Sequence, residues 1–383
     1  MSIGTLLALR LAGAGFDGDP FSVLTTSSDR LWEIADRRGP VVGVSLLVWL
    51  GAFGLALAVS RDRAGRAAAR LLALSLVYAP LVLLATAALE PSVAVERLLL
   101  MVGAPALAAI THAALGGYRA LAFACGATVL AYSVDLIAGS PLTQLSLVGP
   151  NPAAGHRFYG VGNELEAILV VLVLAGTGAA LTGFAPRAVV RRGVEAFLVV
   201  AAVFSFVFAY GRYGADVGAA IVLPLGGAVA AALFADRPRL ALLALAVPLP
   251  ALAILAAADL LTGSNAHLTR TVLQAGSGND VLAVFGRRLR EAGESFGRPL
   301  LLPGLPLVLA SALVAWLRRD RIAVWLRGRP AMRAGLIGAF AATLVGTLAN
   351  DSGALLLEVG AAYLLAFVGF AWAEAGDQPG RYP

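Results

Sequence analysis

The chain has 383 residues, of which 59% are hydrophobic and 14% charged, and its mean hydropathy is +0.84. Soluble globular domains are about half apolar and a quarter charged, so this composition excludes an ordinary soluble domain. The single cysteine, Cys125, excludes an intrachain disulfide and a zinc site built from cysteines. The formal charge of +6 comes from arginines in short clusters between apolar runs, without a basic stripe of interleaved aromatics, and we expect no nucleic-acid partner.

In chain order, apolar runs bounded by charge, glycine and proline are long enough to cross a hydrocarbon core of roughly 30 Å. They predict an all-α, polytopic transmembrane helical bundle whose partner is the lipid bilayer. The segments at 195–211 and 217–234 are short and are alternatively re-entrant or tilted. The eleven expected spanning helices cover 40–59, 68–89, 97–115, 119–138, 163–184, 195–211, 217–234, 239–261, 299–317, 331–349 and 353–373.

The domain organisation follows from these runs. Residues 1–39 form an extracytoplasmic lead-in, partly disordered or interfacial, and residues 40–373 form a single transmembrane domain. Residues 374–383 are a cytoplasmic tail. No large soluble domain is expected to be attached to the transmembrane domain.

Arginine placement predicts the orientation, because positive charge stays on the cytoplasmic side. Alternate connections are rich in arginine, which places the N-terminus outside and the C-terminus inside. The connection 262–298 is the exception, since it carries five arginines on the predicted outer side. The spacing of Val281, Phe285 and Leu289 predicts an amphipathic helix lying on the surface there. The arginines of the inner set are Arg61, Arg63, Arg66, Arg70, Arg119, Arg187, Arg191, Arg192, Arg237, Arg239, Arg318, Arg319, Arg321, Arg327 and Arg329.

The segment 149–166 carries the densest polar motif. Its prolines stop a helix, and Asn163 can cap the next helix, whose first amides attract an anion. His156 and Arg157 add donors for a phosphate or a carboxylate, and Tyr159 and Glu164 follow them. The alternative is an ordinary capped helix start with acids that complement its dipole.

Two further motifs lie in short connections between predicted helices. Arg212 and Asp216 lie four residues apart between two short helices, either in a site that dips inward or in a local ion pair. The segment 350–353, Asn-Asp-Ser-Gly, joins the last two helices by a tight turn, in which Asp351 or Ser352 can cap the final helix. Glu358 lies inside an apolar run, where an acid needs a partner such as Arg157 or Arg212.

A fourth motif, Asp-Leu-(Ile/Leu)-X-Gly-Ser, occurs at 135–140 and again at 259–264. Each aspartate ends a helix, where the dipole disfavours an acid, so a nearby cation is expected. The recurrence indicates either an internal repeat of four helices or chance in a low-complexity chain.

All four motifs fall at the predicted outer ends of their helices, which favours one outward-facing polar site. We expect Asp216, Asp351 and Glu164 to act as general base or metal ligand, with the identity of any metal or cofactor open. The absence of a strand before Gly162 excludes a dinucleotide fold. The residues expected to bind substrate are His156, Arg157, Tyr159, Asn163, Arg212, Asn350, Ser352 and Glu358.

The motifs at 133–140, 157–164, 214–218 and 350–353 resemble those of a family of bacterial multi-pass membrane proteins from actinobacteria and Gram-positive relatives. The family has no assigned activity, so no catalytic residue carries over. Some members carry an extracytoplasmic alkaline-phosphatase-like domain ahead of the membrane part, and residues 17–40 are similar to the segment that follows such a domain. The resemblance implies a role in the cell envelope at the bacterial plasma membrane.

Three functions remain open from the sequence. The first is an envelope enzyme, or the membrane half of one, that acts on a lipid-linked or anionic, phosphate-bearing substrate. The second is a transporter or flippase in which Glu164, Glu166 and Glu358 bind a coupling ion or a proton. The third is a membrane partner of a separate extracytoplasmic enzyme. Acids in an outward groove would favour the first, and acids near the midplane the second.

Overall fold

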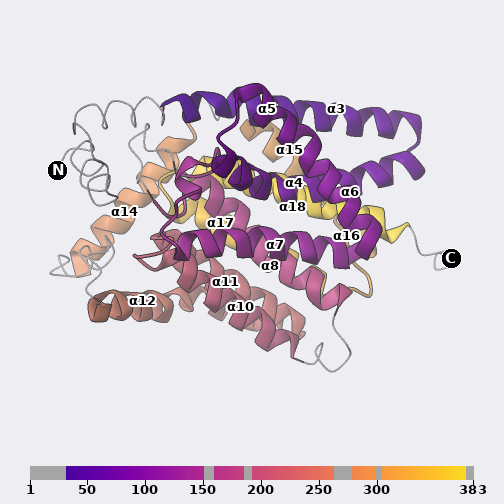
Figure 1. The fold of residues 1–383 in the computed structure, drawn as a ribbon. Helices are drawn as coiled ribbons and strands as arrows, with labels where there is room; N and C mark the ends of the chain where they lie inside the picture. The colour runs from indigo at the N-terminus through magenta and orange to yellow at the C-terminus, as the bar shows by residue number, and fades with distance from the viewer. Residues whose placement is uncertain (1–31, 151–158, 185–191, 263–277, 298–303, 377–383) are drawn as a thin grey trace, which may run out of the picture.

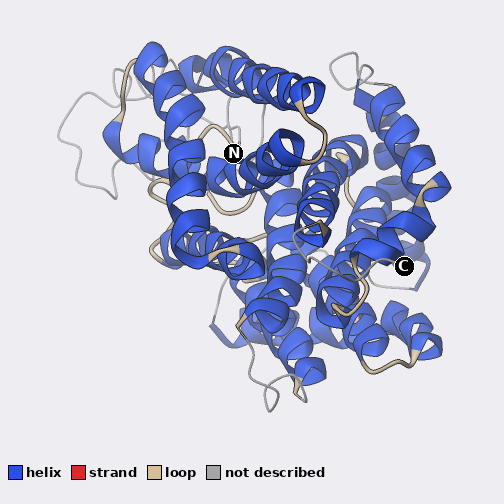
Figure 2. Cartoon of the chain, turned by 90° about the vertical axis from the view of Figure 1, so that its right-hand side faces the viewer, coloured by secondary structure: helices blue, strands red, loops and turns tan. Residues whose placement is uncertain are grey.

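The computed structural model describes residues 32–150, 159–184, 192–262, 278–297 and 304–376. Every regular element in these ranges is a helix, as Figures 1 and 2 show. The predicted all-α class is therefore confirmed for the described part of the chain. The longer helices run roughly side by side across the view of Figure 1.

Nine helices of the described ranges are long and apolar enough to cross a membrane, which is consistent with a multi-pass membrane protein. Two of the predicted segments fall on shorter apolar helices, α10 and α15. The number of crossings and the orientation remain predictions. The elements are Trp32–Val59 (containing η1, Gly39–Gly43, and α3, Val44–Val59), α4 (Arg63–Leu89), Val93–Leu115 (α5, Val93–Leu98; η2, Leu99–Gly103; α6, Ala104–Leu115), α7 (Gly117–Ile137), η3 (Thr143–Leu145), α8 (Asn163–Gly183), α10 (Gly193–Ala209), α11 (Val217–Phe234), η5 (Pro238–Ala246), α12 (Pro248–Thr262), α14 (Gly278–Ser295), α15 (Gly304–Leu317), α16 (Arg319–Trp325), α17 (Pro330–Ala349) and α18 (Gly353–Ala375).

The first helix begins earlier than the apolar run predicts. It starts at Trp32 and continues without a break into α3, so the last residues of the predicted lead-in are helical. The expected amphipathic connection contains α14, which crosses one end of the bundle at an angle (Figure 1).

The centre of the bundle is α17, which packs against both α8 and α11. Glycines allow this approach: a β-carbon at Gly335 would lie 2.6 Å from the carbonyl oxygen of Leu174 in α8. On the other side of the same helix, a β-carbon at Gly338 would lie 2.5 Å from the carbonyl oxygen of Gly226 in α11. Small residues that let backbones approach are typical of helix pairs in membranes, where packing replaces the hydrophobic driving force.

A proline inside α4 is accommodated by hydroxyl groups from two other helices. Pro80 frees the carbonyl of Leu76, because proline has no amide hydrogen to donate to it. The Tyr363 hydroxyl of α18 donates to that oxygen at 2.9 Å. From α7, Thr128 donates to Val77 and Tyr132 to Pro80, both at 2.9 Å. Backbone polar groups inside a bilayer must find such internal partners.

Arginines of the predicted inner set hold helix ends together at one end of the bundle. Arg70 Nε lies 2.7 Å from Glu374 Oε1 and its Nη2 bonds the carbonyl of Ala373 at 2.9 Å. Arg329 bonds the carbonyl of Glu374 at 3.2 Å, and Arg119 bonds that of Gly183 at 2.8 Å. Cations at helix C-termini satisfy carbonyls that lack an intrahelical partner. We call this the arginine end; it lies on the right in Figure 1.

Substituting Gly335 tests the central contact. We expect Gly335→Ala to lower the unfolding free energy by about 1–3 kcal/mol, because the new methyl group meets backbone atoms of α8 that cannot move aside. The matched control is Gly369→Ala in α18, which has open space around its Cα and should be neutral or slightly stabilising. Chemical unfolding in detergent measures both; equal effects would contradict the assigned packing.

Candidate functional site

The end of the bundle opposite the arginine end gathers the polar motifs. Here α8 begins at Asn163, α17 ends at Ala349 and α18 begins at Gly353, so the 350–352 turn faces the first turn of α8. The structure thus brings together two motifs that are far apart in the sequence. The basis of this meeting is the close packing of α17 on α8.

Four side chains form a hydrogen-bonded network, which we call the amide–acid cluster: Asn163, Glu166, Asn350 and Asp351. The Asn163 amide donates to Asp351 Oδ1 at 3.2 Å. The Asn350 amide donates to Asn163 Oδ1 at 3.3 Å and to Glu166 Oε2 at 2.9 Å. Each asparagine therefore holds a carboxylate by an amide hydrogen. Hydrogen bonds to an ionised group are among the stronger ones in proteins.

The turn itself is capped differently from the prediction. Asn350 Oδ1 accepts the amide hydrogen of Ser352 at 3.2 Å, and the Ser352 hydroxyl donates to Asp351 at 3.3 Å. Ser352 occupies the capping position of α18 but makes no capping hydrogen bond with its side chain, so that alternative of the prediction was wrong. The amide of Ala354 donates to the hydroxyl of Ser295, at the end of α14, at 2.9 Å. A more distant helix therefore supplies this acceptor.

Asn163 likewise does not cap α8. It is the first residue of the helix, Gly162 occupies the capping position, and the Asn163 side chain points to the 350–352 turn. The sequence pattern identified the correct helix start, but the tertiary contact with Asp351 determines what this side chain bonds.

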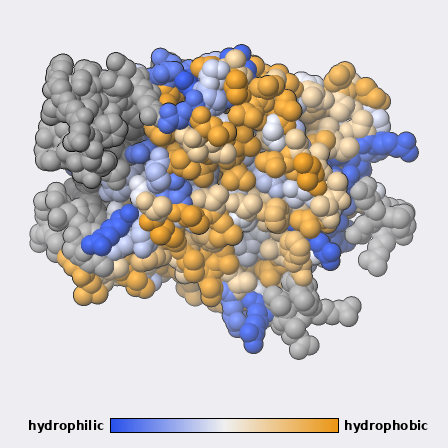
Figure 3. All heavy atoms as spheres, viewed as in Figure 1, coloured by the Kyte–Doolittle hydropathy of each residue, from blue (hydrophilic) through white to orange (hydrophobic). Residues whose placement is uncertain are grey.

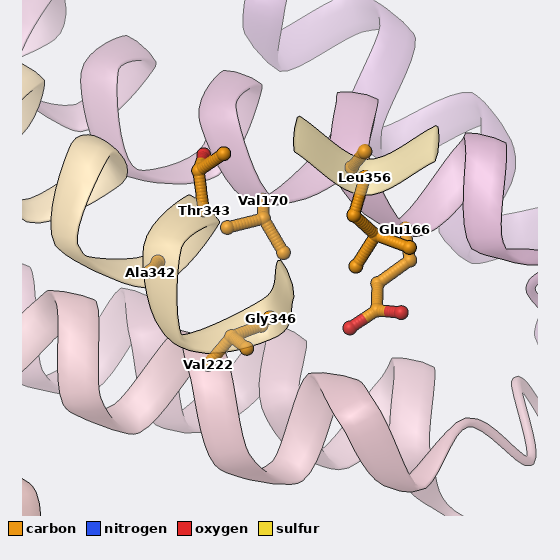
Figure 4. Close-up of a pocket in the computed structure, with 8 residues that line it drawn as sticks. Glu166, Val170, Val222, Ala342, Thr343, Gly346 and Leu356 are labelled. Atoms are coloured by element: carbon orange, nitrogen blue, oxygen red, sulfur yellow. The ribbon is translucent and has the colours of Figure 1, made fainter. Parts of the chain in front are cut away.

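Glu166 is the most deeply buried acid of the cluster, with 1% of its surface exposed. Its carboxylate lies against Gly218 in the first turn of α11, where a β-carbon would come within 2.4 Å of Oε1. Figure 4 shows the carboxylate beside a small, mostly apolar pocket of about 10 Å³, the room for about one water molecule. The pocket is lined by Glu166, Ala167, Val170, Val222, Ala342, Thr343, Gly346 and Leu356.

The 210–216 segment lies at the same end of the bundle, where its backbone contacts residues 159–161. The Val161 amide donates to the carbonyl of Gly214 at 2.8 Å. Gly160, at a φ of +84°, has its Cα so close to that carbonyl that a β-carbon would lie 2.1 Å from the oxygen. Only glycine fits at position 160, where the backbone passes this close to the 210–216 segment. The Tyr159 hydroxyl adds a bond to the carbonyl of Gly211 at 3.3 Å.

Within that segment Asp216 is 3% exposed and caps α11, because its Oδ1 accepts the Gly218 amide at 3.3 Å. Glu166 lies against the same Gly218, so both acids meet at the start of α11. Arg212 is exposed. Asp216 therefore lies beside the amide–acid cluster.

Arg38 was missed by the sequence analysis, because its polar surroundings placed it in the lead-in. Its guanidinium contacts both oxygens of Glu164, at 3.1 and 2.9 Å, and also bonds the carbonyl of Gly149 at 2.9 Å. Arg38 therefore ties the first helix to both sides of the 150–163 segment. Glu164, predicted as catalytic, is held in this ion pair.

Glu358 lies apart from the cluster, on a different contact. Its carboxylate packs against Gly304 at the start of α15, where a β-carbon would be 2.5–2.6 Å away. Its Oε1 is buried and has no hydrogen-bond partner among the described residues. His156 and Arg157, the other predicted binding residues, lie outside those residues.

Asp135 has a partner other than the cation that the helix dipole implied. Its two oxygens accept the backbone amides of Leu142 and Thr143, at 3.0 and 2.8 Å. The chain turns back after α7 and supplies these donors locally. Of the second copy of this motif, the Asp259 side chain and Ser264 lie outside the described residues.

The described residues contain no group of three His, Cys, Asp or Glu side chains placed to hold a metal ion. What the site offers is carboxylates fixed by amides, suited to accepting a proton or orienting a donor. The chain matches no protein-family model, no curated protein and no solved structure.

Removing the Asn350 side chain tests the cluster. We expect Asn350→Ala to lower the unfolding free energy by about 1–3 kcal/mol, because the buried carboxyl group of Glu166 loses its amide donor. In a Glu166→Ala background the same change should cost at least about 0.5 kcal/mol less. Chemical unfolding of the four proteins in detergent measures the difference, and equal costs in both backgrounds would rule out this coupling.

Proposed function

We propose that the chain is a multi-pass protein of the bacterial plasma membrane that serves the cell envelope, as an enzyme or as the membrane partner of one. The amide–acid cluster faces the extracytoplasmic side and handles a lipid-linked or other anionic, phosphate-bearing substrate. The observation that carries this proposal is the bonding of Asn163 and Glu166 to Asn350 and Asp351, two segments that the sequence separates widely.

The depth of the cluster favours surface chemistry over transport. Asn163 is the first residue of α8 and Glu166 the fourth, so at 1.5 Å per residue the buried acid lies only about 4.5 Å from the helix start. Asp351 lies in the turn itself. Groups at this level of a spanning helix meet lipid headgroups, which carry the phosphate of a lipid-linked substrate.

The roles divide according to the contacts. Asp351 and Asp216 are the candidates for the general base, because both are fixed by hydrogen bonds at the meeting of the helices. Glu164 acts as a positioning residue through Arg38. A phosphate near these acids needs positive charge beside it, and Arg212 of the 210–216 segment is the candidate for this among the described residues. The resemblance of the motifs to an envelope-associated family supports the same assignment.

Charge-removing, shape-preserving substitutions test the enzyme proposal. We expect Asp351→Asn or Asp216→Asn to abolish complementation of the envelope defect of a deletion strain, while protein level and unfolding stay close to normal. Asparagine can still cap α11 at position 216, so loss of function there would show that the negative charge of the aspartate is required.

The matched control is Asp320→Asn, an exposed acid at the start of α16 that should complement fully. Full complementation by both site variants would overturn the catalytic roles. If a deletion of the chain still gave the defect in that case, an assembly partner of a separate enzyme would be the remaining function.

Transport is a second candidate function, and the single observation that favours it is the environment of Glu358. A carboxylate oxygen without a hydrogen-bond partner, inside a helix able to span the membrane, is costly as an anion and is typical of proton-carrying acids. Its contact with Gly304 would couple its protonation to the position of α15.

Proton flux into proteoliposomes, followed with a trapped pH dye under an imposed potential, tests this candidate. We expect Glu358→Gln to reduce a wild-type flux at least tenfold, and Glu195→Gln, an exposed acid at the start of α10, to leave it unchanged. A wild-type protein without flux, or a Glu358→Gln protein with normal flux, would remove the transport function.

A further inference from the structure

A short helix among arginines follows α15 at the arginine end. Helix α16 begins at Arg319, directly after α15 ends at Leu317, and it contacts α18, on the right in Figure 1. Leu326, which follows α16, is buried, and Ile322 packs against the same hydrophobic core. These two side chains are four residues apart, so they lie on one side of the helix. Helix α16 is therefore held on the bundle by its apolar side.

The outer surface of α16 and its flanks carries an excess of positive charge. Residues 318–333 contain six arginines and a single acid, Asp320, and α15 contains no charged residue. From α18, Glu374 lies nearby, since Arg329 bonds its carbonyl, but its carboxylate is bonded by Arg70 at 2.7 Å. The surface therefore stays cationic when both acids are counted. Its exposed arginines are Arg318, Arg319, Arg321, Arg327 and Arg333.

Helix α15 indicates what covers this surface. It has no buried residue, and Leu313, Val314 and Leu317 near its end are each more than half exposed. In a multi-pass membrane protein, apolar side chains in this position meet lipid acyl chains; the surface in Figure 3 is largely hydrophobic, with hydrophilic side chains near its margins. Trp316 is also exposed, with Cζ of Arg319 5.1 Å from the centre of its ring, and tryptophan is enriched at the membrane–water interface. The arginines after α15 therefore lie at the level of the lipid headgroups.

We propose that Arg318, Arg321 and Arg327 bind the phosphates of anionic phospholipid headgroups at this end of the bundle. An arginine fork can bind a phosphate with two hydrogen bonds. The excess of positive charge selects lipids with a net negative charge, because the same arginines repel the ammonium group of a zwitterionic lipid. Bound headgroups hold the end of α15, which has no buried residue of its own. The proposal stands whether the chain is an enzyme, a partner or a transporter, and for either orientation in the membrane.

A fluorophore at the end of α15 measures which lipids lie beside these arginines. Leu317→Cys places a thiol at an exposed position next to Arg318, and a Cys125→Ala background removes the other cysteine. The full-length protein is labelled with bimane and placed in nanodiscs of phosphatidylcholine with a minority of phosphatidylglycerol. Bromine on the acyl chains of one lipid or of the other quenches the fluorophore, so the two samples together give the local ratio of the lipids.

We expect phosphatidylglycerol to be enriched at this position at least about fivefold over the bulk mixture, which is the effect of one arginine near an anionic surface. Arg318→Gln/Arg321→Gln should reduce the enrichment at least about threefold. Arg318→Lys/Arg321→Lys should keep most of it, because the charge remains. The matched control, Arg237→Gln/Arg239→Gln, removes two exposed arginines that follow α11 and should leave the enrichment unchanged.

Three results would overturn the proposal: no enrichment in the parent protein, an unchanged enrichment in the glutamine variant of α16, or an equal loss in the control. An absence of enrichment would mean that these arginines orient the chain in the membrane without selecting a lipid. Chemical unfolding in detergent verifies that each variant is folded. Because the measurement uses no substrate, it is independent of the complementation and flux experiments.

Discussion

The close approach of α17 to α8 on one side and to α11 on the other is the constraint on which the site depends. Gly335 and Gly338 bring the backbones together, and no side chain separates them. With the helices fixed at this distance, the end of α17 has to meet the start of α8. The hydrogen bonds of the two asparagines there therefore depend on the axial register of α17 against α8, which the packing inside the bundle determines. A change of one turn in that register would separate Asn350 from Asn163 and leave Glu166 without its amide partner.

The two ends of the bundle have different chemistry, and part of the difference follows from the polar groups at helix ends. Helix C-termini expose carbonyl oxygens and attract cations, whereas N-termini expose amides and tolerate acids. At the arginine end, Arg70 and Arg329 bond carbonyls at the end of α18. At the opposite end, α8, α11 and α18 begin among acids. The charged side chains of the described residues named above are thus separated between the two ends, with these arginines at one end and these acids at the other.

Hydropathy alone predicted the helical class and the approximate place of each apolar helix, because a run of about 20 apolar residues has few other uses. The alternation of arginines then placed the four motifs at one predicted end. Neither signal predicted the individual hydrogen bonds. Asn163 and Asp351 are 188 residues apart, so their contact depends on tertiary packing. Asp135 accepts hydrogen bonds from backbone amides that a turn brings close to it, and the sequence motif does not predict the geometry of that turn. Arg38 was overlooked because a polar stretch before an apolar run resembles a lead-in, although the helix already begins at Trp32.

The hydroxyl bonds around Pro80 limit how the protein can move. Tyr363 ties α18 to the turn of α4 that precedes Pro80, and Thr128 and Tyr132 tie α7 to the same region. In lipid no water can replace these hydrogen bonds if the helices slide past one another. We therefore expect the three helices to move as one body. By contrast α15 has no buried residue, so fewer contacts oppose its displacement.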